Sequence, residues 1–344
     1  MLGNIRKPSV IVDAPIFNFI KPGANDSLSS MSGIDLQDLL YYIENCYLEL
    51  RNRLGFDDEV TFGLELEFEN AARKRIEQKL EESRLDEIWE LREDASLHNG
   101  VEINSPILKD VSDSWSQLKK VCQIVCKHAS IDKHSGGHIH VGTQVLGNKT
   151  ESWKNFIKLW SVYENIIYRF VYGDYLSARP SMARYAEPMA KEFWRDYQGM
   201  LKCDSLTLND VLRKVSHQRY QAVNFNNVSN FDHFQTKNTI EFRCPNGTLE
   251  PVIWQNNVNL FVHLLQYSKS TGYDDDMVQK RRRINEDRYS SLDFYGEIYL
   301  QQALELCDMI FTNNFDKVYF LRQYLKSFEI RNKELAKPKL FVKK

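Results

Sequence analysis

Four short stretches of the chain alternate apolar residues with ionisable ones, which is the period of a β-strand. They are TFGLELEFE (61–69), GVEINS (100–105), GGHIHVGT (136–143) and NTIEFRCP (238–245). In each stretch the apolar side chains take one set of alternate positions, and glutamate, histidine or arginine takes the other. The pattern predicts four strands that each have one apolar side and one ionisable side.

The segments between these strands show apolar residues at helical spacing. They predict helices over 35–55, 71–90, 113–129, 151–173, 250–268, 286–309 and 315–333, and one more strand over 220–228. The mixed charge run DDDMVQKRRRINEDR (274–288) is interpreted as a solvated turn, with an anion-binding patch as the alternative.

An antiparallel sheet can bury one face under helices and leave its other face open. We therefore predict an α+β fold, in which a curved antiparallel sheet carries helices on its convex face and a site on its concave face. The predicted organisation is a loop-rich N-terminal arm (1–33), a catalytic domain (34–270) and a helical C-terminal extension (271–344) packed on the same domain.

Composition narrows the class of protein. The 344 residues are 42% apolar and 27% charged, with a net charge of −2, which argues against a strongly basic nucleic-acid-binding protein. No apolar run is long enough to cross a bilayer, and no signal peptide is evident, so a cytoplasmic location is expected. The six cysteines form no C-x-x-C pair and are interpreted as free thiols.

The ionisable sides of the four strands carry the candidate chemistry. If the strands are neighbours, Glu65, Glu67, Glu102 and Glu241 converge and raise one another's pKa values. Mg²⁺ or Mn²⁺ relieves such crowding, because hard cations prefer oxygen ligands. A metal-lined site is thus favoured over a merely solvated face. On the residues alone, the two histidines of GGHIHVG fit metal ligands, phosphate contacts or surface polar groups equally.

Taken in order, the motifs GLELEFE, DASLHNGVEINSP, GGHIHVG, RYQAVNFNN and TIEFRCPNGT resemble those of the amidoligases. These belong to the glutamine synthetase and glutamate–cysteine ligase superfamily of carboxylate–amine ligases. The resemblance spans about residues 61–266. It implies a fold like the glutamine synthetase catalytic domain, and ATP-dependent amide-bond formation through an acyl phosphate. ATP and Mg²⁺ (or Mn²⁺) are the implied cofactors.

The resemblance also implies roles for individual residues. The implied metal ligands are Glu65, Glu67, Asp94, Glu102, His138 and Glu241. His140 is implied to approach the nucleotide phosphate, and Arg219 and Arg243 to face the transferred phosphoryl group. Asp94 stands where the synthetase has a glutamate, which shortens its reach.

Three further residues are weaker candidates. Asn226 suits a nucleotide contact, although a role at the sheet edge explains it equally well. Arg184 and Tyr185, in RPSMARYAEP, suit a substrate carboxylate, although Arg184 fits an ordinary surface arginine as well. His98 is interpreted as a loop residue.

Two rival functions are a hydrolase in which the His/Glu cluster binds Zn²⁺ or Mn²⁺, and a noncatalytic interaction protein derived from the ligase fold. Arginine beside the carboxylates in TIEFRCP argues against the hydrolase, because hydrolysis has less need of it. The expected partners are a carboxylate and an amine, each a small molecule, peptide or protein. We expect no nucleic acid or membrane partner, and a monomer or dimer.

Overall fold

The computed structural model describes residues 5–6, 15–31, 33–132, 134–173, 182–190, 193, 203, 205–215, 219–228, 237–288 and 298–325. The strands of its main sheet are β3 (Thr61–Phe68), β4 (Glu90–Arg92), β5 (Val101–Asn104), β6 (Leu108–Lys109), β7 (Gly137–Gly142), β8 (Val223–Asn224) and β9 (Thr239–Phe242). Their order is β4-β5-β3-β7-β9-β8, with β6 paired to the start of β3, and every pairing is antiparallel. The predicted antiparallel sheet is confirmed.

Helices cover the apolar side of this sheet. They include α3 (Arg73–Glu82), α4 (Ser112–Val125), α5 (Thr150–Val171) and α9 (Pro251–Lys269). Phe242 of β9 stacks on Phe261 of α9 at a ring-centroid distance of 4.0 Å, and Phe62 of β3 stacks on Trp115 of α4 at 5.0 Å. These aromatic contacts place the main core between the sheet and its helices.

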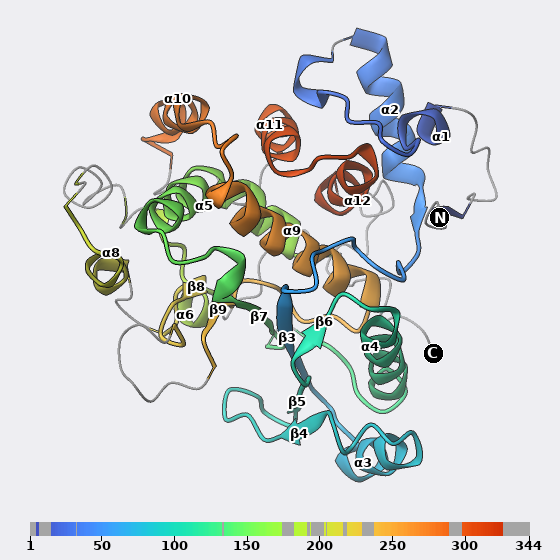
Figure 1. Cartoon of the computed structure of the whole chain (residues 1–344). Helices are drawn as coiled ribbons and strands as arrows, with labels where there is room; N and C mark the ends of the chain where they lie inside the picture. Colours follow the sequence, from blue (N-terminus) through green and yellow to red (C-terminus); the bar gives the residue numbers. More distant parts are fainter. Residues whose placement is uncertain are drawn as a thin grey trace.

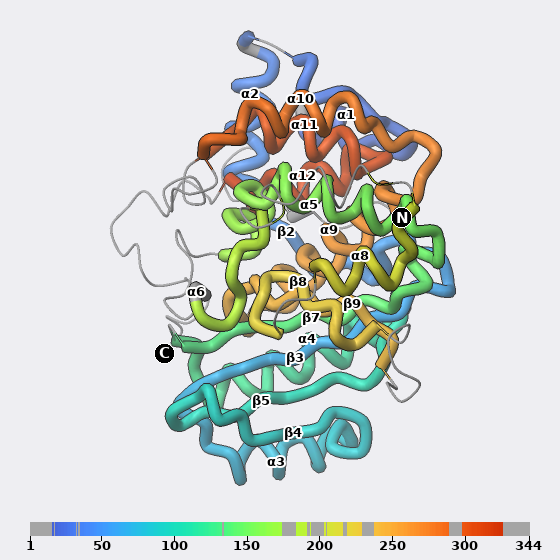
Figure 2. Tube along the Cα trace, turned by 90° about the vertical axis from the view of Figure 1, so that its left-hand side faces the viewer, coloured from blue at the N-terminus to red at the C-terminus, as the bar shows by residue number. Residues whose placement is uncertain are grey.

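A second layer of helices lies farther from the sheet. It consists of α10 (Asp275–Asn285), α11 (Leu300–Ile310) and α12 (Asn314–Leu325). Helices α5 and α9 run side by side between the sheet and α11 and α12 (Figure 1). Figure 2 shows β4, β5, β3, β7 and β9 following one another, with α10 and α11 far from β4. The glutamine synthetase-like arrangement and the division into domains stay predictions.

The interpretation of 274–288 as a solvated turn is wrong, because Asp275–Asn285 is helical. Asp274 caps the helix by accepting a hydrogen bond from the Met277 amide at 2.8 Å. Arg281 forms a half-buried ion pair with Glu305 of α11 at 2.6 Å. Only a narrow strip of α10 is buried, so its apolar periodicity is too weak to reveal a helix.

Other predicted elements are shorter than expected. The helix predicted over 35–55 is α2 (Gly33–Asn45), after which the chain enters β2 (Tyr47–Leu48). The helix predicted over 71–90 ends at Glu82 and leaves room for β4. The remaining short elements are β1 (Ile5–Arg6), α1 (Pro15–Phe19), η1 (Leu28–Ser30), η2 (Thr143–Val145), α6 (Met182–Tyr185) and α8 (Leu208–Val215).

The described part of the N-terminal arm packs against the body. Ile16, Ile20 and Leu28 are buried, as expected of residues that join the core. The carboxylate of Asp308 in α11 accepts hydrogen bonds from the amides of Leu28 and Ser29 at 2.9 and 2.7 Å. Among the described residues, no helix has both the length and the apolar character needed to span a membrane.

Candidate functional site

The ionisable sides of β3, β5, β7 and β9 share one face of the sheet. Residues opposite one another in the register are Glu67 and Glu102, Glu65 and His138, and His140 and Glu241, which we call the polar cluster. Apart from Glu65, each of its members is at most 9% exposed. The sequence predicted an open charged face, whereas these side chains are largely buried against one another and against loop backbone.

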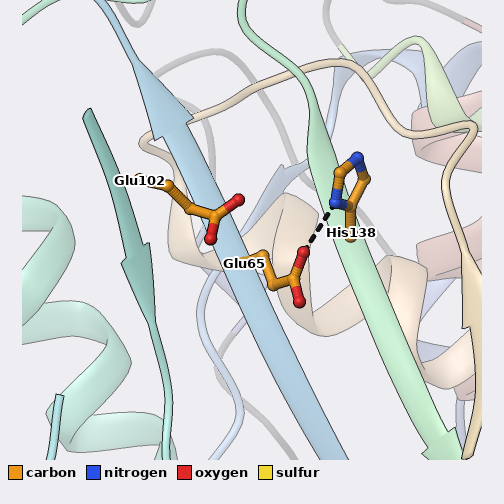
Figure 3. A group of neighbouring side chains, drawn as sticks. All are labelled: Glu65, Glu102 and His138. Carbon is orange, nitrogen blue, oxygen red and sulfur yellow. Dashed lines mark hydrogen bonds and ion pairs between the residues drawn. The ribbon is translucent and has the colours of Figure 1, made fainter. Parts of the chain in front are cut away.

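Glu65 is the centre of the polar cluster. Its carboxylate lies 2.7 Å from Nδ1 of His138 and 2.8 Å from Nε2 of His140. Figure 3 shows it between Glu102 on the next strand and His138. Burial acts to raise the pKa of Glu65, but the hydrogen bonds to both histidines outweigh burial and hold that pKa well below its ordinary value.

The pKa of His138 is shifted in the opposite direction from that of Glu65. Burial and the charge of Arg243 act to lower its pKa. The hydrogen bond to Glu65 and the charge of Glu67 outweigh them, so the pKa of His138 lies above its ordinary value. Each partner of the Glu65–His138 pair therefore favours the charged form of the other.

Glu67 and Glu102 form the acidic part of the polar cluster. The amide of Gly136 donates a hydrogen bond to Glu67 at 2.6 Å. Burial, joined by the negative charge of Glu65, raises the pKa of Glu102 to about 7. Glu102 is thus a carboxylate that the fold holds in an unfavourable environment.

Glu241 is the best-partnered carboxylate of the cluster. Arg243 donates to its Oε1 through Nη1, and Asn224 of β8 donates to its Oε2 at 2.7 Å. Burial acts to raise the pKa of Glu241, but the charges of His138 and Arg243 keep that pKa below its ordinary value.

Within the described part of the chain, three groups of side chains could hold a metal ion. They are Glu65, Glu102 and His138; Glu65, His140 and Glu241; and Glu67, Asp94 and Glu102, with the donor atoms of each group within 4.8 Å of one another. The first two groups each combine two carboxylates with one imidazole, and the third consists of carboxylates alone, so all three suit a hard divalent cation. The crowding of Glu67 and Glu102 also suits a metal site, since a bound cation would compensate the negative charge of the two carboxylates.

A cleft of about 380 Å³ opens beside the polar cluster, at the end of the strands where His140 lies. Among the residues that line it are Thr61, Arg92, Asn104, His140, Lys237 and Thr239. Gly142 also lines the cleft, and a Cβ added there would lie 2.3 Å from Oε1 of Gln144 and 2.6 Å from the Thr61 hydroxyl. A ligand in this cleft would contact His140 and the edge of Glu65.

The predicted substrate residues and Arg219 meet near Arg243. The guanidinium of Arg184 lies 5.1 Å from the Tyr185 ring centroid, and that of Arg219 lies 5.2 Å from the Tyr220 ring. The two tyrosine rings pack edge to face at 5.5 Å. Nε of Arg243 donates to the Tyr185 carbonyl at 3.2 Å, which connects this group to the polar cluster.

The predicted nucleotide contact, Asn226, is exposed, and its backbone amide donates a hydrogen bond to the side-chain oxygen of Asn224 at 2.9 Å. Asn224, rather than Asn226, therefore reaches Glu241. Two residues of the face were missed in the sequence. Arg92 lies opposite Glu102, and Asn104 lies opposite Glu65. The alternation Glu90-Leu91-Arg92 is the signal for β4, but three residues are too few to separate it from the preceding helical pattern.

Carboxylates, imidazoles and arginine on one buried face of an antiparallel sheet form a candidate enzymatic site in an α+β fold. A family model described as "putative amidoligase enzyme" matches residues 82–265, more than half of the chain. The chain belongs to this amidoligase family, whose description assigns a ligase-type function. The match includes every polar-cluster residue except Glu65 and Glu67, which lie before it. No curated protein matches the chain.

Proposed function

We propose that the chain is an ATP-dependent carboxylate–amine ligase that forms an amide bond through an acyl phosphate. The observation that carries this proposal is the convergence of three metal-capable groups with Arg243 on one face of the sheet. Membership of the amidoligase family supports the same class of reaction.

The chemistry explains why such a face is needed. A carboxylate does not react with an amine in water, so the acid must first receive a phosphoryl group from ATP. The amine then attacks the acyl carbon, the C–N bond forms and phosphate leaves. Phosphoryl transfer is accelerated chiefly by positioning and by positive charge around the phosphate oxygens.

The two acidic ends of the polar cluster would hold the cations. Glu67, Asp94 and Glu102 would form one set of ligands, and Glu65, His140 and Glu241 would form the other. When bound, divalent cations neutralise charge on phosphate oxygens and polarise the transferred group. Asp94 fits despite its shorter side chain, because its carboxylate lies within reach of both glutamates.

The arginines would supply the remaining positive charge. Arg243 is held by Glu241 and by the Tyr185 carbonyl, so its guanidinium is oriented before any substrate arrives. Arg219, exposed beside Tyr220, would approach the phosphoryl group. Arg184 and Tyr185 would bind the acid substrate.

The nucleotide would lie in the cleft at the His140 end. Nε2 of His140 is bonded to Glu65, and its Nδ1 lies 3.2 Å from the Thr239 hydroxyl, which fixes the ring at the cleft. Lys237 adds positive charge to the cleft wall. The acid and the amine would then meet the nucleotide over the carboxylates of the cluster.

Calorimetric titration with ATP, with and without Mg²⁺, tests this function. We expect Mg²⁺-dependent binding to the wild type and to Glu87→Gln, a matched control at an exposed position. Glu241→Gln keeps the shape of the side chain but should lose the binding, because a cation ligand becomes neutral. Absence of ATP binding to the wild type with either Mg²⁺ or Mn²⁺ would overturn the proposal.

A further inference from the structure

Two histidines outside the polar cluster touch each other. The rings of His98 and His134 pack edge to face, with centroids 4.6 Å apart and an interplanar angle of 85°. His98 is exposed and His134 is half-buried. They come from different loops, one between β4 and β5 and the other between α4 and β7, so the contact is made by the fold and not by sequence proximity.

Both loops are fixed to the end of β3. The carboxylate of Glu69 accepts hydrogen bonds from the amides of His98 and Asn99, each at 2.8 Å. The His134 loop continues to Gly136, whose amide donates to Glu67. The pair therefore lies at the end of the sheet that carries Glu67, Asp94 and Glu102.

The cleft lies at the opposite end of the same strands. It is lined by the start of β3, the end of β5 and the end of β7, including Thr61, Asn104 and Gly142. A substrate held over the polar cluster thus has the cleft on one side and the histidine pair on the other.

The ring nitrogens of the pair are uncommitted within the described part of the chain, where neither ring has a hydrogen bond or ion pair. The nearby carboxylates bond to backbone instead. Glu69 accepts from His98, Asp132 accepts from the His134 amide at 2.7 Å, and Asp94 accepts from the Ser96 amide at 2.6 Å. In the polar cluster, by contrast, both histidines are bonded to Glu65.

We propose that the His98–His134 pair accepts the proton of the incoming amine, an inference that rests on the proposed ligase function. An alkylammonium ion has no lone pair and cannot attack an acyl phosphate. Imidazole is the side chain that takes up a proton near neutral pH.

The step balances in atoms and charge. One ammonium proton passes to an imidazole nitrogen and then to water. The freed amine lone pair forms the C–N bond, and the bond between the acyl carbon and the phosphate oxygen breaks. The second proton leaves with phosphate, and the third remains on the amide nitrogen.

Hydroxylamine provides a sharp test, because it is uncharged at neutral pH and needs no base to become a nucleophile. Hydroxamate formation is first measured with wild type, ATP, Mg²⁺ and a panel of amino acids, dicarboxylic acids and short peptides. The best acid is then used with hydroxylamine and with methylamine as acceptors. The variants are His98→Gln, His134→Gln and their double variant, with His128→Gln as the matched control.

We expect the double variant to lose about 100-fold in methylamine turnover, a typical contribution of a general base. Its hydroxamate formation and its ATP binding should stay within about twofold of wild type. Equal loss with both acceptors, or no loss with either, overturns the role of the pair while leaving the ligase function intact. Absence of hydroxamate in the wild type with every acid overturns the ligase function and this inference with it.

Discussion

Glu67 and Glu102 face each other directly across the antiparallel pair of β3 and β5, and both are almost fully buried. Directly opposed like charges destabilise a sheet. With Asp94 they form a group whose donor atoms lie within 4.8 Å of one another. The same pair of residues therefore opposes folding in the absence of a cation and favours binding of a cation.

Glu102→Gln should stabilise the metal-free protein at alkaline pH. Burial and the charge of Glu65 raise the pKa of Glu102 from 4.5 to about 7, so the folded state keeps a proton that the unfolded state loses. The contribution of Glu102 to the free energy of unfolding therefore falls as pH rises through this window. Above it, the variant should gain up to about 3 kcal/mol. Urea denaturation with a chelator, at about pH 5 and about pH 8, measures the gain.

The exposed Glu87→Gln serves as the control and should change the free energy of unfolding by less than about 0.5 kcal/mol at both pH values. Added Mg²⁺ should stabilise the wild type more than Glu102→Gln, because a ligand that binds only the folded state raises its stability. A variant that is less stable than wild type at the higher pH would show that Glu102 is not under repulsion.

Glu65→Gln, unlike Glu102→Gln, should destabilise the metal-free protein. The bonds from His138 and His140 outweigh burial and keep the pKa of Glu65 below its ordinary value. A depressed carboxyl pKa gives stability above the unfolded pKa, which is lost as pH falls through the folded one. At neutral pH without metal, the variant should therefore lose about 1–3 kcal/mol, because two imidazoles lose a charged partner. The same urea denaturation measures this loss, and a gain would contradict the pairing.

The different surroundings of Glu65 and Glu67 show how much of the site could be predicted from the sequence. Alternation in 61–69 placed Glu65 and Glu67 on the ionisable side correctly, because a strand has a period of two. The same alternation, seen in all four strands, led to the prediction that Glu65, Glu67, Glu102 and Glu241 repel one another. The partners of each depend on register between strands far apart in the chain, which alternation does not contain. Register gives Glu65 two histidines and Glu67 a glutamate.

Elements held by few contacts were the hardest to predict. Strand β4 has three residues, and its Arg92 joins the face only because β5 pairs with it. Helix α10 is charged nearly all round and buries only Val278 and Asn285. The ends of long helices with a wide apolar stripe, such as α5 and α9, were predicted to within a residue or two. In such helices the buried residues recur at helical spacing, so the sequence pattern shows them directly.

Gly137→Ala should destabilise the fold. Gly137 lies on the apolar side of β7 under α9, where an added Cβ would lie 2.4 Å from Cη2 of Trp254. The indole is buried and its Nε1 is bonded to the Thr248 carbonyl at 2.9 Å, so it cannot move away freely. We expect a loss of about 1–3 kcal/mol in the free energy of unfolding. Chemical denaturation measures it.

Gly63→Ala is the matched control on the neighbouring strand. Its Cβ would meet nothing closer than 3.8 Å, on the polar side of the sheet. We expect a change within about 0.5 kcal/mol. Equal destabilisation by both substitutions would mean that loss of glycine itself, and not the contact with Trp254, is responsible.

Asp316→Asn should destabilise the contact between α12 and the body. Asp316 is 2% exposed and pairs with Arg51 at 2.6 Å, and Asn259 of α9 donates to the same oxygen at 2.9 Å. Breaking a buried pair leaves an uncompensated charge and costs about 3–5 kcal/mol. Burial acts to raise the pKa of Asp316, but Arg51 keeps it below its ordinary value, so this stability should be lost on acidification.

Thermal denaturation of Asp316→Asn at several pH values checks both statements, with the exposed Asp86→Asn as control. The difference between wild type and Asp316→Asn should shrink as pH falls through the folded pKa, because the wild-type carboxyl is then also neutral. A difference that does not depend on pH would assign the effect to packing and not to the charge of the pair.

Arg243→Lys tests orientation in the proposed reaction. The guanidinium bonds Glu241 and the Tyr185 carbonyl at once, whereas an ammonium cannot match this planar fork. We expect ATP affinity within about threefold of wild type, because the positive charge remains, and a fall in turnover of about 10- to 100-fold. Calorimetry with ATP and hydroxamate formation measure the two effects, with Arg73→Lys, at a half-buried position outside the polar cluster, as control. Unchanged turnover would remove Arg243 from the reaction, whereas loss of ATP binding would assign it to ground-state binding.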